Sequence, residues 1–229
     1  MQLHPAQCRA QVIDAVVITQ RNHIIGAGVP LGAVPGERGH AMRAQALEFF
    51  CQLVILGEQH AGQYAKSQKS ELVLVHDANP DRARVVGELL GVPWTSNLAD
   101  VGASDAEIVS IATPDHLHHE AAIRMLEAGK HLLVEKPLAT RTSEALEIVE
   151  LSRKNDRKVT INLGNRWMGG FQSIREAIQE GEIGDPVYAY CRCSDTIWVP
   201  TEMLSWAGRS GPQWFLFAHT MDLIRWFLG

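Results

Sequence analysis

The feature that most constrains the fold is a regular alternation of apolar runs and helical stretches between residues 53 and 165. Strands alternating with helices of this length form βαβ units around a mainly parallel sheet. We therefore predict an α/β fold with a Rossmann-type, doubly wound parallel sheet, whose ligands bind beyond the carboxyl ends of the strands. Strands are expected at 53–56, 71–75, 107–112, 131–134 and 159–163, and helices at 61–69, 80–90, 115–128 and 143–155.

The flanking segments do not continue this pattern. Residues 1–50 carry scattered prolines and a glycine-rich patch, and predict a poorly defined N-terminal extension. Residues 51–165 form the expected dinucleotide-binding domain. Residues 166–229 predict only the start of an α+β substrate and oligomerisation domain, with helices at 171–179 and 215–228, one strand at 186–194 and a loop at 195–211. One strand cannot form a sheet, so this second domain is expected to be incomplete.

Composition excludes several function classes. The net charge of -5 and the pI of about 6.0 argue against nucleic-acid binding, which needs a basic surface. No apolar run approaches the ~20 residues that span a bilayer, and the N-terminus does not resemble a secretory signal. The four cysteines lack metal-site or disulfide-framework spacing. We expect a cytoplasmic protein that binds neither nucleic acid nor membrane.

A glycine-rich segment follows the first predicted strand. Gly57 and Gly62 match the first and third glycines of the G-x-G-x-x-G dinucleotide fingerprint, but Gln59 stands at the second. Asp77 ends the next strand, where a carboxylate accepts hydrogen bonds from ribose hydroxyls. The alternative is a tight strand–helix turn without a dinucleotide. A second glycine-rich segment, 26–32, is a poorer candidate because prolines break any helix after it.

A longer motif carries a family resemblance. Thr113-Pro114 and His118 are followed by Gly129-Lys130-His131 and by Glu135-Lys136-Pro137, and 164–167, 180–184 and 219–222 add further matches. This combination resembles the Gfo/Idh/MocA oxidoreductase family over residues 53–229. The resemblance implies a two-domain NAD(P)-dependent enzyme that acts on a sugar, an inositol or a related polyol. It also implies a homo-oligomer formed through the second domain.

The resemblance also implies roles for individual residues. Lys136 and His219 are the expected catalytic residues, and the bond before Pro137 is expected to be cis. The expected cofactor residues are Gly57, Gln59, Gly62, Asp77, Thr113, Pro114, His118, Glu135 and Lys136, and the expected substrate residues are Arg166, Trp167 and Asp222. Asp77 favours NAD, because its carboxylate repels the 2′-phosphate of NADP; NADP is the alternative, since Arg82 and Arg84 are near in sequence. No metal is expected, because His116, His118 and His119 lack a further ligand at suitable spacing.

One departure from the family pattern leaves alternatives open. Many members carry an aspartate one helical turn before the histidine that matches His219, and this chain has Phe215 there. The first alternative is a non-catalytic, dinucleotide-binding regulator. The second is an inactive, shortened member of the family.

Overall fold

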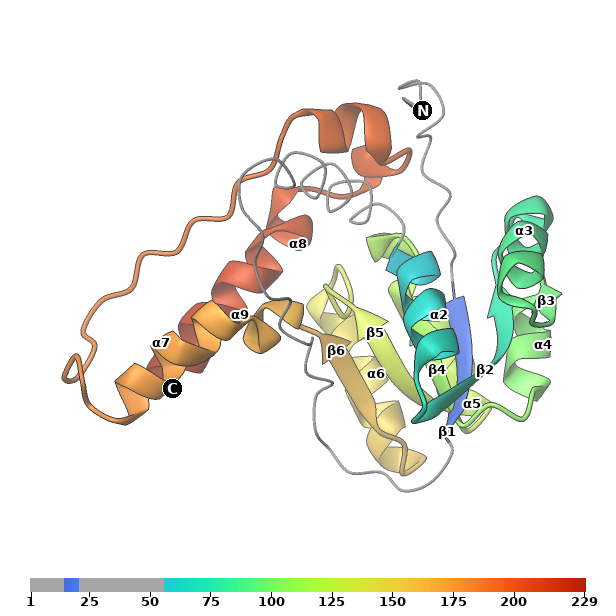
Figure 1. Ribbon diagram of the computed structural model, residues 1–229, viewed down its shortest axis with the longest axis horizontal. Coiled ribbons are helices and arrows are strands. Elements are labelled where there is room, and N and C mark those ends of the chain that lie inside the picture. Colours follow the sequence, from blue (N-terminus) through green and yellow to red (C-terminus); the bar gives the residue numbers. More distant parts are fainter. Residues whose placement is uncertain (1–14, 21–55) are drawn as a thin grey trace.

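The computed structural model describes residues 15–20 and 56–229, which form an α/β domain followed by a helical C-terminal part (Figure 1). Six strands make one sheet in the order β3-β2-β1-β4-β5-β6. The pairs β4–β5 and β5–β6 are parallel, as the sequence predicts, and β2 also pairs in parallel with a short strand, β3, that was not predicted. The strands are β1 (Ala15–Gln20), β2 (Ser70–His76), β3 (Trp94–Thr95), β4 (Ile108–Ile111), β5 (His131–Glu135) and β6 (Val159–Asn162).

The central strand β1 differs from the sequence-based expectation. It lies within the segment 1–50 that we assigned to an extension, and it pairs antiparallel with both β2 and β4. Its run Ala-Val-Val-Ile-Thr is rich in β-branched residues, which suit a strand. The sheet is therefore mixed rather than wholly parallel. Of the strand expected at 53–56, residues 53–55 lie outside the described residues, and Leu56 begins a helix.

Helices cover the sheet and enclose two apolar clusters. The larger cluster packs β4 and β5 against α5 and α6 through side chains such as Ile111, Met125 and Ile148, and the smaller packs β2 against α2 and α3. The helix expected at 80–90 is confirmed: the Asn79 side chain accepts from two backbone amides, and Gly91 ends the helix at φ 68°. The helices are α2 (Leu56–Lys66), α3 (Pro80–Leu90), α4 (Leu98–Ala103), α5 (His118–Glu127) and α6 (Thr142–Lys154).

The C-terminal part is helical and extended rather than sheet-forming. Helix α7 (Gly169–Gln179) lies beside α9 (Phe217–Leu228), and the two meet at Phe171 and Phe227, whose ring centres are 6.4 Å apart (Figure 1). The helix expected at 215–228 is interrupted at Leu216, which separates α9 from the short α8 (Pro212–Phe215). Within the described residues, no helix has the length and apolar character that crossing a membrane requires.

The strand predicted at 186–194 is wrong. These residues run as an extended segment that pairs with no strand in the described part of the chain. Val187, Tyr188 and Tyr190 are 96%, 78% and 77% exposed. Alternating apolar residues favour a strand, but a strand forms only where a neighbour supplies hydrogen-bond partners.

Candidate active site

Lys136 follows β5 at the carboxyl end of the sheet. The peptide bond between Lys136 and Pro137 is cis, as expected. The lysine side chain is only 7% exposed, and its Nζ donates a hydrogen bond of 2.9 Å to the backbone oxygen of Phe215. The same Nζ lies 4.0 Å from the centre of the Phe215 ring. Burial lowers the pKa of Lys136, although the carboxylates of Asp115 and Glu135 oppose the shift.

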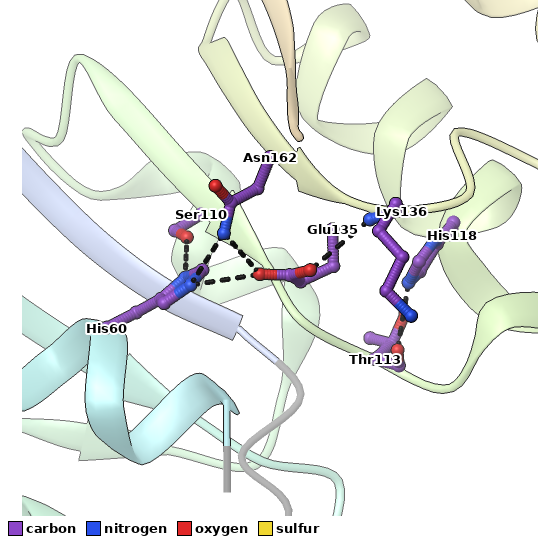
Figure 2. A network of polar contacts seen from close by, with 7 residues as sticks. All are labelled: His60, Ser110, Thr113, His118, Glu135, Lys136 and Asn162. Atoms are coloured by element: carbon purple, nitrogen blue, oxygen red, sulfur yellow. Dashed lines mark hydrogen bonds and ion pairs between the residues drawn. The ribbon is translucent and has the colours of Figure 1, made fainter. Parts of the chain in front are cut away.

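Glu135 is held by side chains from two other elements (Figure 2). Its Oε1 accepts from Asn162 Nδ2 at 2.6 Å and lies 3.0 Å from His60 Nε2. Its Oε2 accepts from the backbone N–H of Lys136 at 3.3 Å. Although burial opposes it, hydrogen bonding and attraction to His60 lower the pKa of Glu135, and Asn162 adds to this effect. The carboxylate is therefore stabilised in its charged form.

His118 joins the loops that follow β4 and β5. It is completely buried, with Nδ1 2.5 Å from the Pro137 oxygen and Nε2 2.9 Å from the Thr113 oxygen. Burial lowers the pKa of His118, against the contributions of the two carbonyl groups and of Asp115. The ring therefore keeps the Thr113-Pro114 segment at a fixed place beside the strand end that carries Lys136.

A pocket brings several of the expected residues together. Thr113, His118, Glu135 and Lys136 line it, with Leu56 from the start of α2 and with Phe215 and Trp206 from the C-terminal part. Pro114 is not among its lining residues; it precedes the 3-10 turn Asp115–Leu117, which begins the helical region expected at 115–128. A second pocket adjoins the first, because Leu204, Trp206 and Phe215 line both. The loop at 195–211, expected to shape a substrate pocket, supplies much of this second lining.

The glycine-rich segment differs from its expected form. Gly57, Gln59 and Gly62 all lie inside α2, so Gly57 is helical rather than at a turn before the helix. The third glycine of the fingerprint ordinarily lets helix and strand pack closely, but a β-carbon at Gly62 would meet no described atom beyond the adjacent turns of its own helix within 4 Å. The part of the motif that the structure retains is the helix start beside the pocket, at Leu56.

Asp77 follows β2 and is completely buried. Its Oδ1 accepts from Arg82 Nε at 3.0 Å, from Arg82 Nη2 at 2.7 Å and from the backbone N–H of Asn79 at 2.7 Å. The carboxylate thus faces an arginine from the first turns of α3. Asp77 does not line either pocket.

His219 lies on α9, near the lysine. Burial and the positive charge of Lys136 lower the pKa of His219, while Glu135 and Asp222 act in the opposite direction. Its Nδ1 is buried and has no hydrogen-bond partner among the described residues. Phe215, the residue that departs from the expected family pattern, contacts Lys136 with its ring and its carbonyl oxygen.

Two of the three expected substrate residues bind each other. Arg166 Nε donates to Asp222 Oδ2 at 2.8 Å, and its Nη2 donates to Asp222 Oδ1 at 2.5 Å. This bidentate pair joins the turn after β6 to α9. Trp167 is 51% exposed and lines neither pocket. The structure therefore does not bring these three residues to the pocket that Lys136 lines.

Comparison with known proteins supports a Rossmann-type oxidoreductase domain. Residues 51–163 match the family described as "Oxidoreductase family, NAD-binding Rossmann fold". The chain belongs to the Gfo/Idh/MocA family. This Gfo/Idh/MocA chain is 29% identical to an inositol 2-dehydrogenase of Saccharopolyspora erythraea and 28% identical to the D-glucoside 3-dehydrogenase of Escherichia coli. These alignments cover 76% and 74% of the chain but 51% and 50% of the relatives, so the chain spans about half their length.

Solved structures show the same fold as this Gfo/Idh/MocA chain. A myo-inositol 2-dehydrogenase from Lactobacillus plantarum superposes with a TM-score of 0.67 at 24% identity, over 75% of this chain and 53% of that one. The WlbA dehydrogenase of Bordetella pertussis, solved with NADH and UDP-GlcNAcA, gives 0.63 at 26% identity, over 74% and 51%.

Sequence reasoning missed several residues of the site. His60, Ser110 and Asn162 join Glu135 in one polar network, yet none was singled out beforehand (Figure 2). Ser110 is buried within β4. His60 lies between Gly57 and Gly62, in a motif whose interpretation depended on the glycines alone. Asn162 and His60 did carry one signal: the carboxyl ends of parallel strands and the helix start meet at the same edge of the sheet.

Proposed function

We propose that this chain binds a nicotinamide dinucleotide and takes part in hydride transfer between that cofactor and a hydroxyl-bearing carbon of a sugar, inositol or related polyol. The observation that carries the proposal is the buried Lys136, which lines one pocket with Thr113, His118 and Glu135 at the carboxyl end of the sheet. Dehydrogenases of inositol and glucosides among the relatives support this substrate class.

The residues at this edge fit a dinucleotide. Leu56, the first described residue of α2, lines the pocket, and a helix N-terminus attracts an anionic diphosphate. Asp77 ends β2 but is completely buried and lines neither pocket, so its expected contact with the adenosine ribose is not part of this fit. Thr113 Oγ1 is buried beside Lys136 and has no partner among the described residues, so it can bond a polar group at the nicotinamide end. NAD is the proposed cofactor, and Arg82 beside Asp77 supports NADP as the alternative.

Lys136 is the proposed proton acceptor. When an alcohol is oxidised, its carbon loses a hydride, with the electron pair, to the bound nicotinamide, and its oxygen loses a proton. Burial lowers the pKa of Lys136, so a larger share of the amine is uncharged at neutral pH and can accept that proton. His219 is a second acid–base candidate, because its pKa is also lowered and its Nδ1 bonds no described group.

The test uses the full chain and a matched pair of variants. NADH binding is followed by fluorescence, and turnover is followed at 340 nm with a panel of inositols, aldoses and alkyl glucosides. We expect Lys136→Met to lower kcat at least about 100-fold, the usual scale for a lost acid–base group, with NADH affinity kept within about threefold. Lys154→Met, at the exposed end of α6, serves as the control. No NADH binding, or equal turnover in both variants, would refute the proposal.

A second function is favoured by the contact between Lys136 and Phe215. The lysine Nζ donates a hydrogen bond to the Phe215 oxygen and lies over the Phe215 ring. The amine therefore already has partners when no substrate is bound. A dinucleotide-binding regulator would bind NADH with no turnover on the panel. Assembly into a homo-oligomer and a cytoplasmic location stay predictions, checked by sedimentation and by cell fractionation.

A further inference from the structure

His60 lies where three strand ends and one helix meet. It projects from α2 toward the ends of β4, β5 and β6, and each of these contributes one partner (Figure 2). His60 Nδ1 is 2.7 Å from Ser110 Oγ, and His60 Nε2 is 3.0 Å from Glu135 Oε1. Asn162 Nδ2 donates to the same Glu135 oxygen and lies 3.4 Å from His60 Nε2.

The chemistry of the partners fixes the direction of these bonds. A charged carboxylate only accepts, so His60 Nε2 carries the hydrogen that Glu135 Oε1 receives. Asn162 gives that oxygen a second hydrogen. His60 Nδ1 and the Ser110 hydroxyl share the remaining hydrogen bond, in which the hydroxyl can either donate or accept. Both oxygens of the Glu135 carboxylate therefore accept hydrogen bonds, because Oε2 accepts from the backbone N–H of Lys136.

We propose that His60 is a positioning residue for the proposed reaction: it fixes the Glu135 carboxylate, which bonds the backbone N–H of Lys136, and so sets the charge environment of the lysine amine. This inference rests on the proposed function of Lys136. His60 does not line the Lys136 pocket, so it acts through Glu135 rather than on substrate. His60 belongs to α2, the helix that would hold the cofactor diphosphate. Its side chain therefore connects that helix to Glu135, the residue before Lys136.

A nucleophilic role for Ser110 is the competing interpretation. Ser110, His60 and Glu135 are spaced like the serine, base and acid of a hydrolase. However, Ser110 is completely buried within β4, and it lines neither of the two pockets. A substrate carbonyl cannot reach its hydroxyl, so the network holds groups in place and does not attack an ester or amide.

The experiment separates the two nitrogens of His60. His60→Gln keeps an N–H near the position of Nε2 and can still donate to Glu135, whereas His60→Asn is too short to do so. His119→Asn, which removes a surface contact with Glu147, is the matched control. We expect His60→Asn to lower kcat about tenfold or more with substrate KM within twofold, and His60→Gln to recover kcat to within about threefold of the unchanged chain.

A second measurement does not need turnover. Trace acylation at pH 7, read by peptide mass spectrometry, gives the reactivity of Lys136 relative to Lys130, a buried lysine bonded to the Ser104 oxygen. Without the His60 hydrogen bond, the Glu135 charge is less compensated and stabilises the Lys136 ammonium. We therefore expect the Lys136 to Lys130 ratio to fall about threefold or more in His60→Asn and to recover in His60→Gln.

The outcomes distinguish this inference from the proposed function. If the unchanged chain neither binds NADH nor turns over, the proposed function fails, and the acylation ratio alone decides the role of His60. Equal ratios in all three proteins overturn the inference. A raised ratio in His60→Asn, or equal losses in the Asn and Gln variants with lowered melting temperatures, shows a merely structural role and overturns it too.

Discussion

Replacing Arg82 with methionine tests how the completely buried Asp77 is stabilised. The substitution removes two hydrogen bonds to Asp77 Oδ1 and keeps the hydrogen bond from the backbone N–H of Asn79. Methionine keeps most of the apolar stem, so the change isolates the guanidinium. Removing one partner of a buried ion pair costs about 3–5 kcal/mol, because a charge is left buried without compensation.

The expected cost here is smaller than that range. The Arg82 side chain is 29% exposed, so water can reach part of the space that it leaves. We therefore expect Arg82→Met to lower the free energy of unfolding by about 2 kcal/mol. For a chain of this size that corresponds to a melting temperature lower by about 4–8 °C.

The control lies on the same helix. Arg84 pairs with Asp81 and Glu88, but all three side chains are largely exposed, so Arg84→Met should cost less than about 0.5 kcal/mol. Both variants are measured by urea denaturation at pH 7, together with Asp77→Asn and the Asp77→Asn/Arg82→Met double variant. A coupling energy near 1–2 kcal/mol between positions 77 and 82 is expected. Equal costs for Arg82→Met and Arg84→Met would refute the reasoning.

Three further outcomes follow from the same structure. Arg82→Met should weaken NADPH binding more than NADH binding, since it removes the cation beside Asp77, the acid expected from the sequence to meet the ribose; an unchanged ratio of the two dissociation constants contradicts this. Phe215→Asp should place a carboxylate beside Lys136, raise the pKa of the lysine, and move the acidic limb of the pH–rate profile to higher pH, whereas Phe215→Leu should not. Burial lowers the pKa of His118 and His219 below the ordinary value of about 6.5, so both favour the uncharged form when folded; their contribution to stability is complete above that pH and is lost as the pH falls below it. Thermal unfolding between pH 7.5 and 5 should show this loss, and His219→Gln should reduce it; an unchanged slope would show that the histidine is not responsible.

The sequence predicted those elements whose signals are local. The helix Pro80–Leu90 is marked in the sequence by a proline in its first turn and by a glycine just past its end, and both act within a few residues. β1 was missed because what makes Ala15–Gln20 a strand is pairing with segments far along the chain. The strand expected at 186–194 failed for the converse reason, since alternating side chains alone supply no hydrogen-bond partner.

The residues of the candidate site also divide into those with a local sequence signal and those that depend on long-range contacts. Thr113, His118, Glu135 and Lys136 were identified from one motif, and the structure brings them to one pocket. His60 was not, because its place near the strand ends does not specify a partner, and only the folded sheet shows that it reaches Glu135. The Arg166–Asp222 pair was likewise invisible: each residue was recognised separately, but their mutual bond depends on how α9 packs.

The position of β1 bears on how the chain folds. The parallel pair β2–β3 and the parallel set β4–β5–β6 are built from neighbours in sequence, and within the sheet only β1 connects them. Each set can form early through local crossovers, whereas β1 must close a much longer loop to reach β4. We therefore expect two partly ordered lobes to appear first and insertion of β1 to complete the cooperative unit. Slow acquisition of amide protection in β1, seen by pulse-labelled hydrogen exchange, would be its kinetic signature.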